Sequence, residues 1–271
     1  MRLGIGSFAY AWAIGVPGFA PPRPMTALDL VERAAELGLG LVQIGDNLPL
    51  HRLSERALDE LQARAAALSV DIEVGTRGIA PEQLVHYLEL AERFSSPILR
   101  IVIDTALHRP DPAEVLSTLR PLLERFERAD VILAIENHDR FAAATLADLV
   151  AELASPCVGI CLDSINSLGA LEGTKEVTAI LAPFVVSLHV KDVIIRRSNE
   201  TMGFVVEGRP AGQGMIDVPW LIGEMRAKAR SPNAILELWP PKGSTIEESI
   251  ATEDEWAKTS IRYLRALIPG R

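Results

Sequence analysis

The stretch Val131-Ile-Leu-Ala-Ile-Glu136-Asn-His-Asp-Arg140 carries the clearest structural signal in the chain. Its run of apolar residues is typical of a strand that is buried on both faces, as in a parallel sheet. Glu136 follows where the apolar run stops, and burying an unpaired carboxylate there would cost several kcal/mol. Glu136 therefore needs a partner, and we expect the ends of other strands to supply it.

Three further apolar runs in the second half of the chain end in a side chain that can bind a metal ion. Their last residues are Asp163, His189 and Glu237. Three carboxylates and one imidazole, counting Glu136, suit a hard or borderline divalent ion such as Mn, Mg, Co or Zn. The sequence therefore predicts one divalent metal ion, held by these four residues.

The order of apolar runs along the whole chain predicts a (β/α)8 TIM barrel. Eight strand-like runs alternate with amphipathic helical segments, without a linker or a break in composition between them. This alternation implies parallel strands joined by helices, and about 270 residues is a usual size for such a barrel. We expect a single α/β domain over residues 1–271.

An open, doubly wound sheet is the alternative fold. No GxGxxG motif follows the first strand, however, and polar residues recur at nearly every strand end. In a barrel these ends converge on one face, where active sites are built. In an open sheet the last four strands would not all reach one point, so the barrel is favoured.

The expected elements follow from periodicity and from capping residues. The predicted strands are residues 3–8, 41–44, 70–74, 97–103, 131–136, 158–163, 184–189 and 234–237. The predicted helices are residues 26–37, 54–68, 81–94, 111–128, 145–153, 171–181, a segment from about 218, and 246–267. Thr26 is expected to cap the first helix. Residues 195–217 are expected to form a long polar loop.

Composition and charge narrow the class of protein. The chain has 271 residues, of which 48% are hydrophobic, and its net charge of −9 argues against a nucleic-acid surface. The N-terminus lacks a signal-peptide pattern, and no apolar run reaches the roughly 18 residues of a transmembrane helix. Cys157 and Cys161 are expected to be small core residues rather than a disulfide, which suits a reducing cytoplasm.

The chain resembles the xylose isomerase-like superfamily of sugar isomerases and epimerases. Glu136, Asp163, His189 and Glu237 look like its metal site, and the resemblance follows the strand order over the whole chain. Its most specific parts are Ile135-Glu-Asn137, Leu162-Asp163, Leu188-His-Val-Lys-Asp192 and Gly212-Gln-Gly-Met-Ile-Asp217. The resemblance implies a metal-dependent enzyme of carbohydrate metabolism that forms a homodimer or homotetramer.

One position departs from the pattern of many sugar epimerases in this group. They have Asp-x-x-His at the sixth strand, whereas this chain has Asp163-Ser-Ile-Asn166, which speaks against a ketohexose 3-epimerase. With Gly6-Ser-Phe-Ala-Tyr10-Ala-Trp12, this pattern is more similar to a subgroup containing oxo-sugar-acid decarboxylases such as 3-oxo-isoapionate decarboxylase. Endonuclease IV, another relative, is excluded because its trinuclear zinc site uses many histidines and this chain has five.

Six further side chains are predicted to contact a small carbohydrate or sugar-acid substrate. They are Tyr10, His138, Asn166, Lys191, Arg209 and Trp239. His138 and Lys191 each lie two residues beyond a predicted ligand, so in extended backbone they face the same side as that ligand.

A sugar acid requires a cation aimed at its carboxylate. We expect Lys191 or Arg209 to point into the pocket for this purpose. Arg77 and Arg100 are weaker candidates for the same role, and Arg100 is alternatively part of an ion pair inside the barrel. Asp192 is expected to cap backbone N–H groups, and Phe8 is expected to be a core residue.

The predicted ligand set favours chemistry next to a carbonyl group. A divalent ion that binds a ketone and its neighbouring hydroxyl would stabilise an enediolate as a Lewis acid. Glu136 and Glu237 would then move protons, with Asp163 and His189 as structural ligands. Isomerisation or epimerisation of a keto sugar is the leading hypothesis. The alternatives are a lyase, either a decarboxylase of a 3-oxo sugar acid or a dehydratase, and a sugar-binding barrel without turnover.

Overall fold

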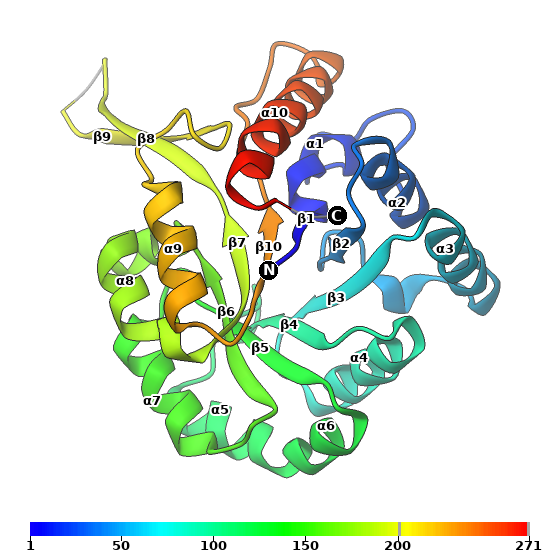
Figure 1. The fold of residues 1–271 in the computed structure, drawn as a ribbon, viewed down its shortest axis with the longest axis vertical. Helices are drawn as coiled ribbons and strands as arrows, with labels where there is room; N and C mark the ends of the chain where they lie inside the picture. Colours follow the sequence, from blue (N-terminus) through cyan, green and yellow to red (C-terminus); the bar gives the residue numbers. More distant parts are fainter. Residues whose placement is uncertain (200–201, 270–271) are drawn as a thin grey trace.

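Eight parallel strands close into a barrel in the computed structural model, which describes residues 1–199 and 202–269 (Figure 1). Around the barrel they follow the order β1, β10, β7, β6, β5, β4, β3, β2. The barrel strands are β1 Leu3–Gly6, β2 Leu41–Ile44, β3 Asp71–Arg77, β4 Ile98–Val102, β5 Ile132–Glu136, β6 Val158–Asp163, β7 Val185–Val190 and β10 Asn233–Leu236. The predicted TIM barrel is confirmed.

Helices surround the barrel on the outside, as Figure 1 shows. They are α1 Ala11–Ile14, α2 Ala27–Glu36, α3 Glu55–Leu68, α4 Pro81–Phe94, α5 Pro112–Leu119, α6 Leu123–Ala129, α7 Ala143–Leu153, α8 Thr174–Leu181, α9 Val218–Lys228 and α10 Ile246–Leu267. The expected cap of the first helix is confirmed, because the Thr26 hydroxyl accepts from the Asp29 N–H and the Asp29 carboxylate accepts from the Thr26 N–H. Across the described residues, no helix combines the length and apolar character that crossing a membrane requires.

The alternation of side chains along each strand separates two buried layers. In β5, Leu133 and Ile135 belong to the large apolar core between strands and helices, whereas Ala134 packs inside the barrel with Cys161. Successive side chains of a strand point to opposite faces. Glu136 therefore faces the barrel interior, one step above Ala134, at the end where the strand stops.

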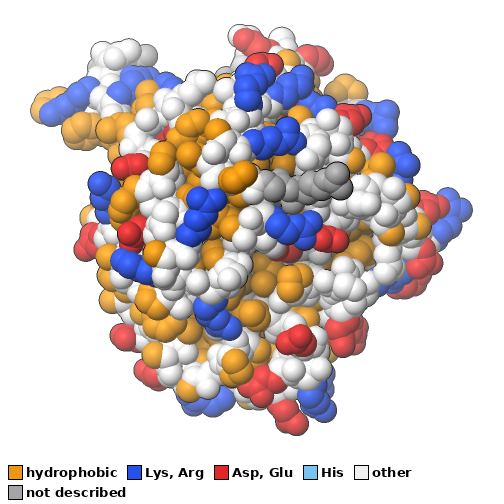
Figure 2. Space-filling view, viewed as in Figure 1, with side chains coloured by type: hydrophobic (Ala, Val, Ile, Leu, Met, Phe, Trp, Pro, Cys, Tyr) orange, Lys and Arg blue, Asp and Glu red, His pale blue; other side chains and the backbone are white. Residues whose placement is uncertain are grey.

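The predicted polar loop over residues 195–217 is wrong in its first part. The described residues there include an antiparallel hairpin of β8 Asp192–Arg197 and β9 Phe204–Arg209. Its β-branched residues suit an extended backbone. The hairpin projects from the barrel at the upper left of Figure 1, and Figure 2 shows hydrophobic and basic side chains gathered on it. Phe204 is among its exposed hydrophobic residues.

Two other boundaries differ from the prediction for local reasons. The predicted helix over residues 111–128 is divided into α5 and α6 by a 3-10 turn, Arg120–Leu122. Pro121 lies in this turn and has no N–H to donate to a continuing helix. The first strand ends at Gly6 rather than at residue 8, because the chain turns there into a 3-10 helix, Ser7–Tyr10.

Candidate active site

Four side chains from β5, β6, β7 and the end of β10 meet at one imidazole nitrogen. His189 Nδ1 lies 3.4 Å from Glu136 Oε2, 3.7 Å from Asp163 Oδ2 and 3.4 Å from Glu237 Oε1. All four residues are buried. The structure therefore brings the four predicted ligands together, since each stands at the same end of a neighbouring strand.

This cluster has the donor atoms and the spacing of a divalent-cation site. Ligands about 2.1 Å from an octahedral ion lie about 3 Å from one another, close to the separations observed here. His189 Nδ1 is buried and has no hydrogen-bond partner among the described residues, although such nitrogens are normally satisfied. Burial would lower the pKa of His189, but the surrounding anionic side chains raise it well above its usual value, so the metal-free ring carries a proton. A divalent ion among the three carboxylates would take the place of that proton.

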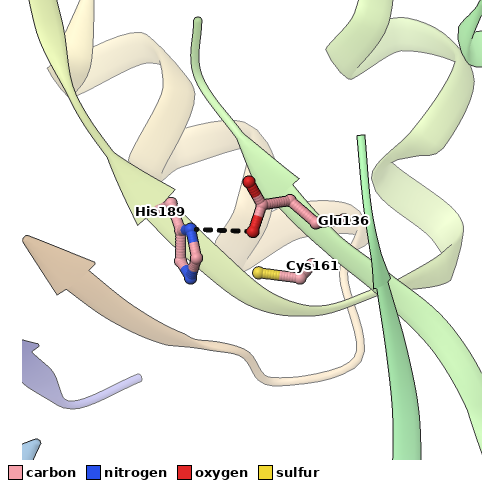
Figure 3. A group of neighbouring side chains, drawn as sticks. All are labelled: Glu136, Cys161 and His189. Carbon is pink, nitrogen blue, oxygen red and sulfur yellow. Dashed lines mark ion pairs between the residues drawn. The ribbon is translucent and has the colours of Figure 1, made fainter. Parts of the chain in front are cut away.

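Two overlapping groups of side chains could hold the ion. One is Asp163, His189 and Glu237, and the other is Glu136, Cys161 and His189. Figure 3 shows the second group, in which the Cys161 thiol lies beside the ion pair of Glu136 and His189. Burial raises the pKa of the Cys161 thiol, so it stays protonated without a metal. The prediction of Cys161 as a small buried residue agrees with its place in the inner apolar layer.

A buried amide behind His189 orients its ring. Gln43 Oε1 lies 2.6 Å from His189 Nε2, and Gln43 Nε2 donates to Glu73 Oε2 over 3.0 Å. Because the amide nitrogen donates to a carboxylate, its oxygen faces His189 and accepts from Nε2–H. When the ring is neutral, that hydrogen bond leaves Nδ1 as its acceptor. The sequence analysis missed this pair, although a polar residue inside each of the runs 41–44 and 70–74 was a visible signal.

Glu136 is held at both oxygens. Arg100 Nε donates to Glu136 Oε2 over 2.5 Å, and Asn166 Nδ2 donates to Glu136 Oε1 over 2.7 Å. Arg100 is thus in the buried ion pair that was one of its two predicted roles. Asn166, which stands where many epimerases have histidine, contacts a predicted acid/base rather than only the substrate space.

Lys191 bridges two of the predicted ligands. Its ammonium lies 2.6 Å from Asp163 Oδ2 and 2.7 Å from Glu237 Oε2, and 5.3 Å from the ring centre of Trp239. Burial would lower the pKa of Lys191, but the two carboxylates raise it, so the amine stays charged. Burial would likewise raise the pKa of Asp163, but Lys191 and His189 hold it below its usual value.

A cavity of about 260 Å³ opens above this cluster, a volume that suits a small carbohydrate. It is lined by Phe8, Arg77, Arg100, Glu136, His138, Asp139, Asn166, Lys191, Glu237 and Trp239. Of the predicted substrate contacts, His138, Asn166, Lys191 and Trp239 lie in this lining. Phe8 lies there too, and not in the apolar core as expected.

Two predicted substrate contacts lie elsewhere. Tyr10 is buried, and its hydroxyl accepts from Arg33 Nε, because the chain leaves β1 early and turns away in a 3-10 helix. Arg209 lies in β9, where it pairs with Glu207 at 3.0 Å and donates to the Gly208 carbonyl. The hairpin that replaced the predicted loop thus keeps Arg209 out of the cavity lining.

The hairpin is tied to the rim of the cavity by backbone contacts. A Cβ at Gly208 would lie 2.0 Å from the Trp239 carbonyl oxygen, so only glycine allows β9 to approach the Trp239 segment. At the base of the hairpin the Asp192 carboxylate accepts from the N–H groups of Gly212, Gly214 and Ile216, as its predicted capping role requires.

The chain belongs to the xylose isomerase-like TIM barrel family, whose pattern it matches over residues 31–267. Among proteins of this kind, it is similar to a 3-oxo-isoapionate decarboxylase from Pectobacterium atrosepticum. The two are 33% identical over 264 residues, which is 97% of this chain and 95% of the relative. A second relative, the uncharacterised protein YihM of Escherichia coli, is 21% identical over 71% of this chain and 59% of its own length.

Solved structures with the same fold include enzymes that act on keto sugars. A D-psicose 3-epimerase, solved in the presence of D-fructose, has a TM-score of 0.75 at 14% identity, with all of both chains covered. A xylose isomerase-like TIM barrel protein from Mycobacterium smegmatis, solved in complex with magnesium, has a TM-score of 0.71 at 14% identity over 97% of each chain. At these identities the likeness establishes the fold alone.

Proposed function

We propose that this protein is a divalent-metal-dependent decarboxylase of an oxo sugar acid, with 3-oxo-isoapionate as the first candidate substrate. The observation that carries the proposal is the 33% identity to a 3-oxo-isoapionate decarboxylase over nearly the full length of both chains. Asn166 in place of the epimerase histidine and the cationic side chains in the cavity lining add support. A neutral keto sugar would not need an exposed cation in the lining, such as Arg77.

The proposed metal residues are Glu136, Asp163, His189 and Glu237, which would hold one ion of Mn, Mg, Co or Zn. When bound, such an ion supplies a Lewis acid for the ketone oxygen. In a 3-oxo acid the carboxylate is attached to the carbon next to the ketone. Its bond to that carbon breaks, the electron pair passes to the ketone oxygen as an enolate, and CO2 leaves.

The side chains of the site would complete the reaction by moving a proton. Glu136 or Glu237, as the carboxylic acid, would protonate the carbon that lost CO2. Asn166 and Arg100 would keep Glu136 in place, because each donates to one of its oxygens. His138 and Trp239, both in the cavity lining, are proposed substrate contacts.

A keto-sugar isomerase or epimerase is the second candidate. It is favoured by Glu136 and Glu237, whose carboxylates both lie 3.4 Å from His189 Nδ1 and so could face one substrate from two strands. In that reaction one carboxylate would remove a proton next to the ketone and a proton would be returned, without loss of carbon.

One experiment separates the two candidates. The metal-loaded protein is incubated in D2O with 3-oxo-isoapionate, and separately with D-fructose, while CO2 and deuterium in the sugar are measured. The proposal expects CO2 release from the acid with one deuterium in the product, and His189→Ala should abolish both. Deuterium exchange into fructose without CO2 from the acid would reverse the order of the candidates.

The assembly and the cellular location remain proposals. We propose a homodimer or homotetramer, on the family resemblance, and light scattering of the purified protein tests it; a monomer would contradict it. We propose the cytoplasm as its location because Cys157 and Cys161 are both free and buried, a state that a reducing compartment preserves.

A further inference from the structure

The wall of the cavity formed by β3, β4 and the end of β2 carries two arginines that share one aspartate. Arg77 Nε donates to Asp46 Oδ2 over 2.9 Å, and Arg100 Nη1 donates to Asp46 Oδ1 over 3.1 Å. Each oxygen of the Asp46 carboxylate therefore accepts from one guanidinium, and this single side chain positions both arginines. Both arginines line the cavity that Glu136 and Glu237 also line.

The three cationic side chains that line the cavity differ in whether they are free to bind a substrate carboxylate. The Lys191 ammonium is already between Asp163 and Glu237, at 2.6 and 2.7 Å. Arg100 is nearly fully buried, with 3% of its side chain exposed, and is committed to Glu136 and Asp46. Neither can turn to a substrate carboxylate without breaking a buried ion pair, which is costly.

Arg77 is the most exposed of the three Arg and Lys side chains that line the cavity. It keeps 31% of its side chain exposed, and its Nη1 donates to the Asp104 carbonyl over 3.2 Å. Its Nη2 has no hydrogen bond to any residue that the structure describes. With Nε and Nη1 both anchored, the guanidinium is held in one orientation, which lowers the entropy cost of binding a ligand.

The ion-paired charges around the proposed metal site also leave room for one anion. Two groups of ion pairs join three cations, Arg77, Arg100 and Lys191, to four carboxylates, Asp46, Glu136, Asp163 and Glu237. His189 is counted as neutral, as in a metal ligand, and Asp139 is left out because its side chain is 62% exposed to solvent. A divalent ion at the proposed metal site would turn this excess of one negative charge into an excess of one positive charge. A single carboxylate on the substrate would balance it.

We propose that Arg77 is the carboxylate-binding residue of this site, held ready by Asp46, and that it selects sugar acids over neutral sugars. This inference rests on the proposed function, because it assigns the carboxylate of the proposed substrate to a residue. The carboxylate loses its charge as CO2 forms, so Arg77 binds the ground state more strongly than the transition state. Its loss should therefore raise KM without lowering kcat of the chemical step.

The test compares two unreactive probes that differ in charge, the sugar acid erythronate and the polyol erythritol. Calorimetry on the metal-loaded wild type should show tighter binding of erythronate. Arg77→Gln should weaken erythronate binding by about 10- to 150-fold, the worth of one charged hydrogen bond, and leave erythritol unchanged. Arg77→Lys should keep part of the preference, because it retains the charge without the fork.

Arg209→Gln, in the hairpin, is the matched control and should bind both probes as the wild type does. Metal content and the unfolding temperature of each variant exclude a folding defect. Equal weakening of both probes by Arg77→Gln, or a wild type without preference for erythronate, would overturn the inference. If the wild type releases CO2 from 3-oxo-isoapionate but Arg77→Gln binds erythronate as tightly as the wild type does, the inference alone is refuted. If Arg77→Gln weakens only erythronate binding but the wild type releases no CO2 from 3-oxo-isoapionate, the proposed function alone is refuted.

Discussion

The two halves of the barrel bring different charges to one cavity. Strands β5, β6, β7 and β10 end in three carboxylates and a histidine, whereas β3 and β4 bring Arg77 and Arg100, and the end of β2 brings Asp46. The three carboxylates converge within 3.7 Å of His189 Nδ1, which has no hydrogen-bond partner among the described residues. From this comparison we expect the acidic half to bind a cation and the basic half to bind an anion.

Loss of a ligand from the acidic half should give the largest effect. Asp163→Asn and His189→Ala should each lose bound metal and activity while the barrel still folds, because both lie at strand ends above the packed apolar layer. We expect metal affinity to fall by more than the roughly 10- to 100-fold that is typical when a residue that hydrogen-bonds a metal ligand is replaced. Elemental analysis and circular dichroism measure metal and fold, and His108→Ala, an exposed histidine, is the control. Full metal occupancy in either variant would refute the ligand assignment.

Neutralising the proposed proton carriers should come next. Glu136→Gln and Glu237→Gln keep an oxygen that can bind metal but remove the acid, so turnover should fall by about 10²- to 10⁴-fold. Initial rates should be compared at equal metal occupancy, with Glu207→Gln in the hairpin as the control. Near wild-type turnover in both variants would exclude the two-carboxylate mechanism and would leave the acidic half with a purely ligating role.

Another buried carboxylate, Glu253, sharpens the comparison because it forms no ion pair with any residue that the structure describes. The Glu253 carboxylate in α10 accepts from the backbone N–H groups of Trp12 and Ala13, at 2.6 and 2.9 Å. Burial raises the pKa of Glu253 to about 7, although these donors lower it. By contrast, burial would raise the pKa of Glu237 too, but His189 and Lys191 hold it below its usual value.

The raised pKa of Glu253 predicts a pH-dependent stability with a definite sign. Between pH 4.5, its ordinary value, and about pH 7, the folded protein binds more protons at this site than the unfolded chain. The free energy of unfolding should therefore fall as pH rises through this window, by at most about 3 kcal/mol. Denaturant unfolding of the wild type against Glu253→Gln measures it, and a difference that stays constant from pH 4.5 to 8 would count against the prediction.

The smallest effect is expected for Gln43, a residue of the basic half that hydrogen-bonds His189 in the acidic half. Gln43→Leu removes the acceptor of His189 Nε2, so the ring loses the hydrogen bond that leaves Nδ1 free. Metal affinity should fall by about 10- to 100-fold, the usual range for a residue behind a ligand. Titration with Mn²⁺ measures it, and Gln62→Leu, on the surface, is the control. Unchanged affinity would show that His189 needs no orientation from β2.

The sequence by itself was sufficient to predict the fold and the meeting of the four proposed metal ligands. Both depend on local periodicity. An apolar run with a polar last residue, repeated at each strand–helix unit, places every last residue at the same end of a parallel barrel. The sequence pattern alone therefore predicted that four side chains lie close together, namely Glu136, Asp163, His189 and Glu237.

Only the tertiary structure decided which long side chains face the cavity and which partners they find. Lys191 and Arg209 were equal candidates in the sequence, but Lys191 lies between two carboxylates while Arg209 pairs within the hairpin. The link from Gln43 to His189 joins residues 146 positions apart. Long polar side chains take the partners that barrel closure brings near them, and those contacts leave no periodic trace in the sequence.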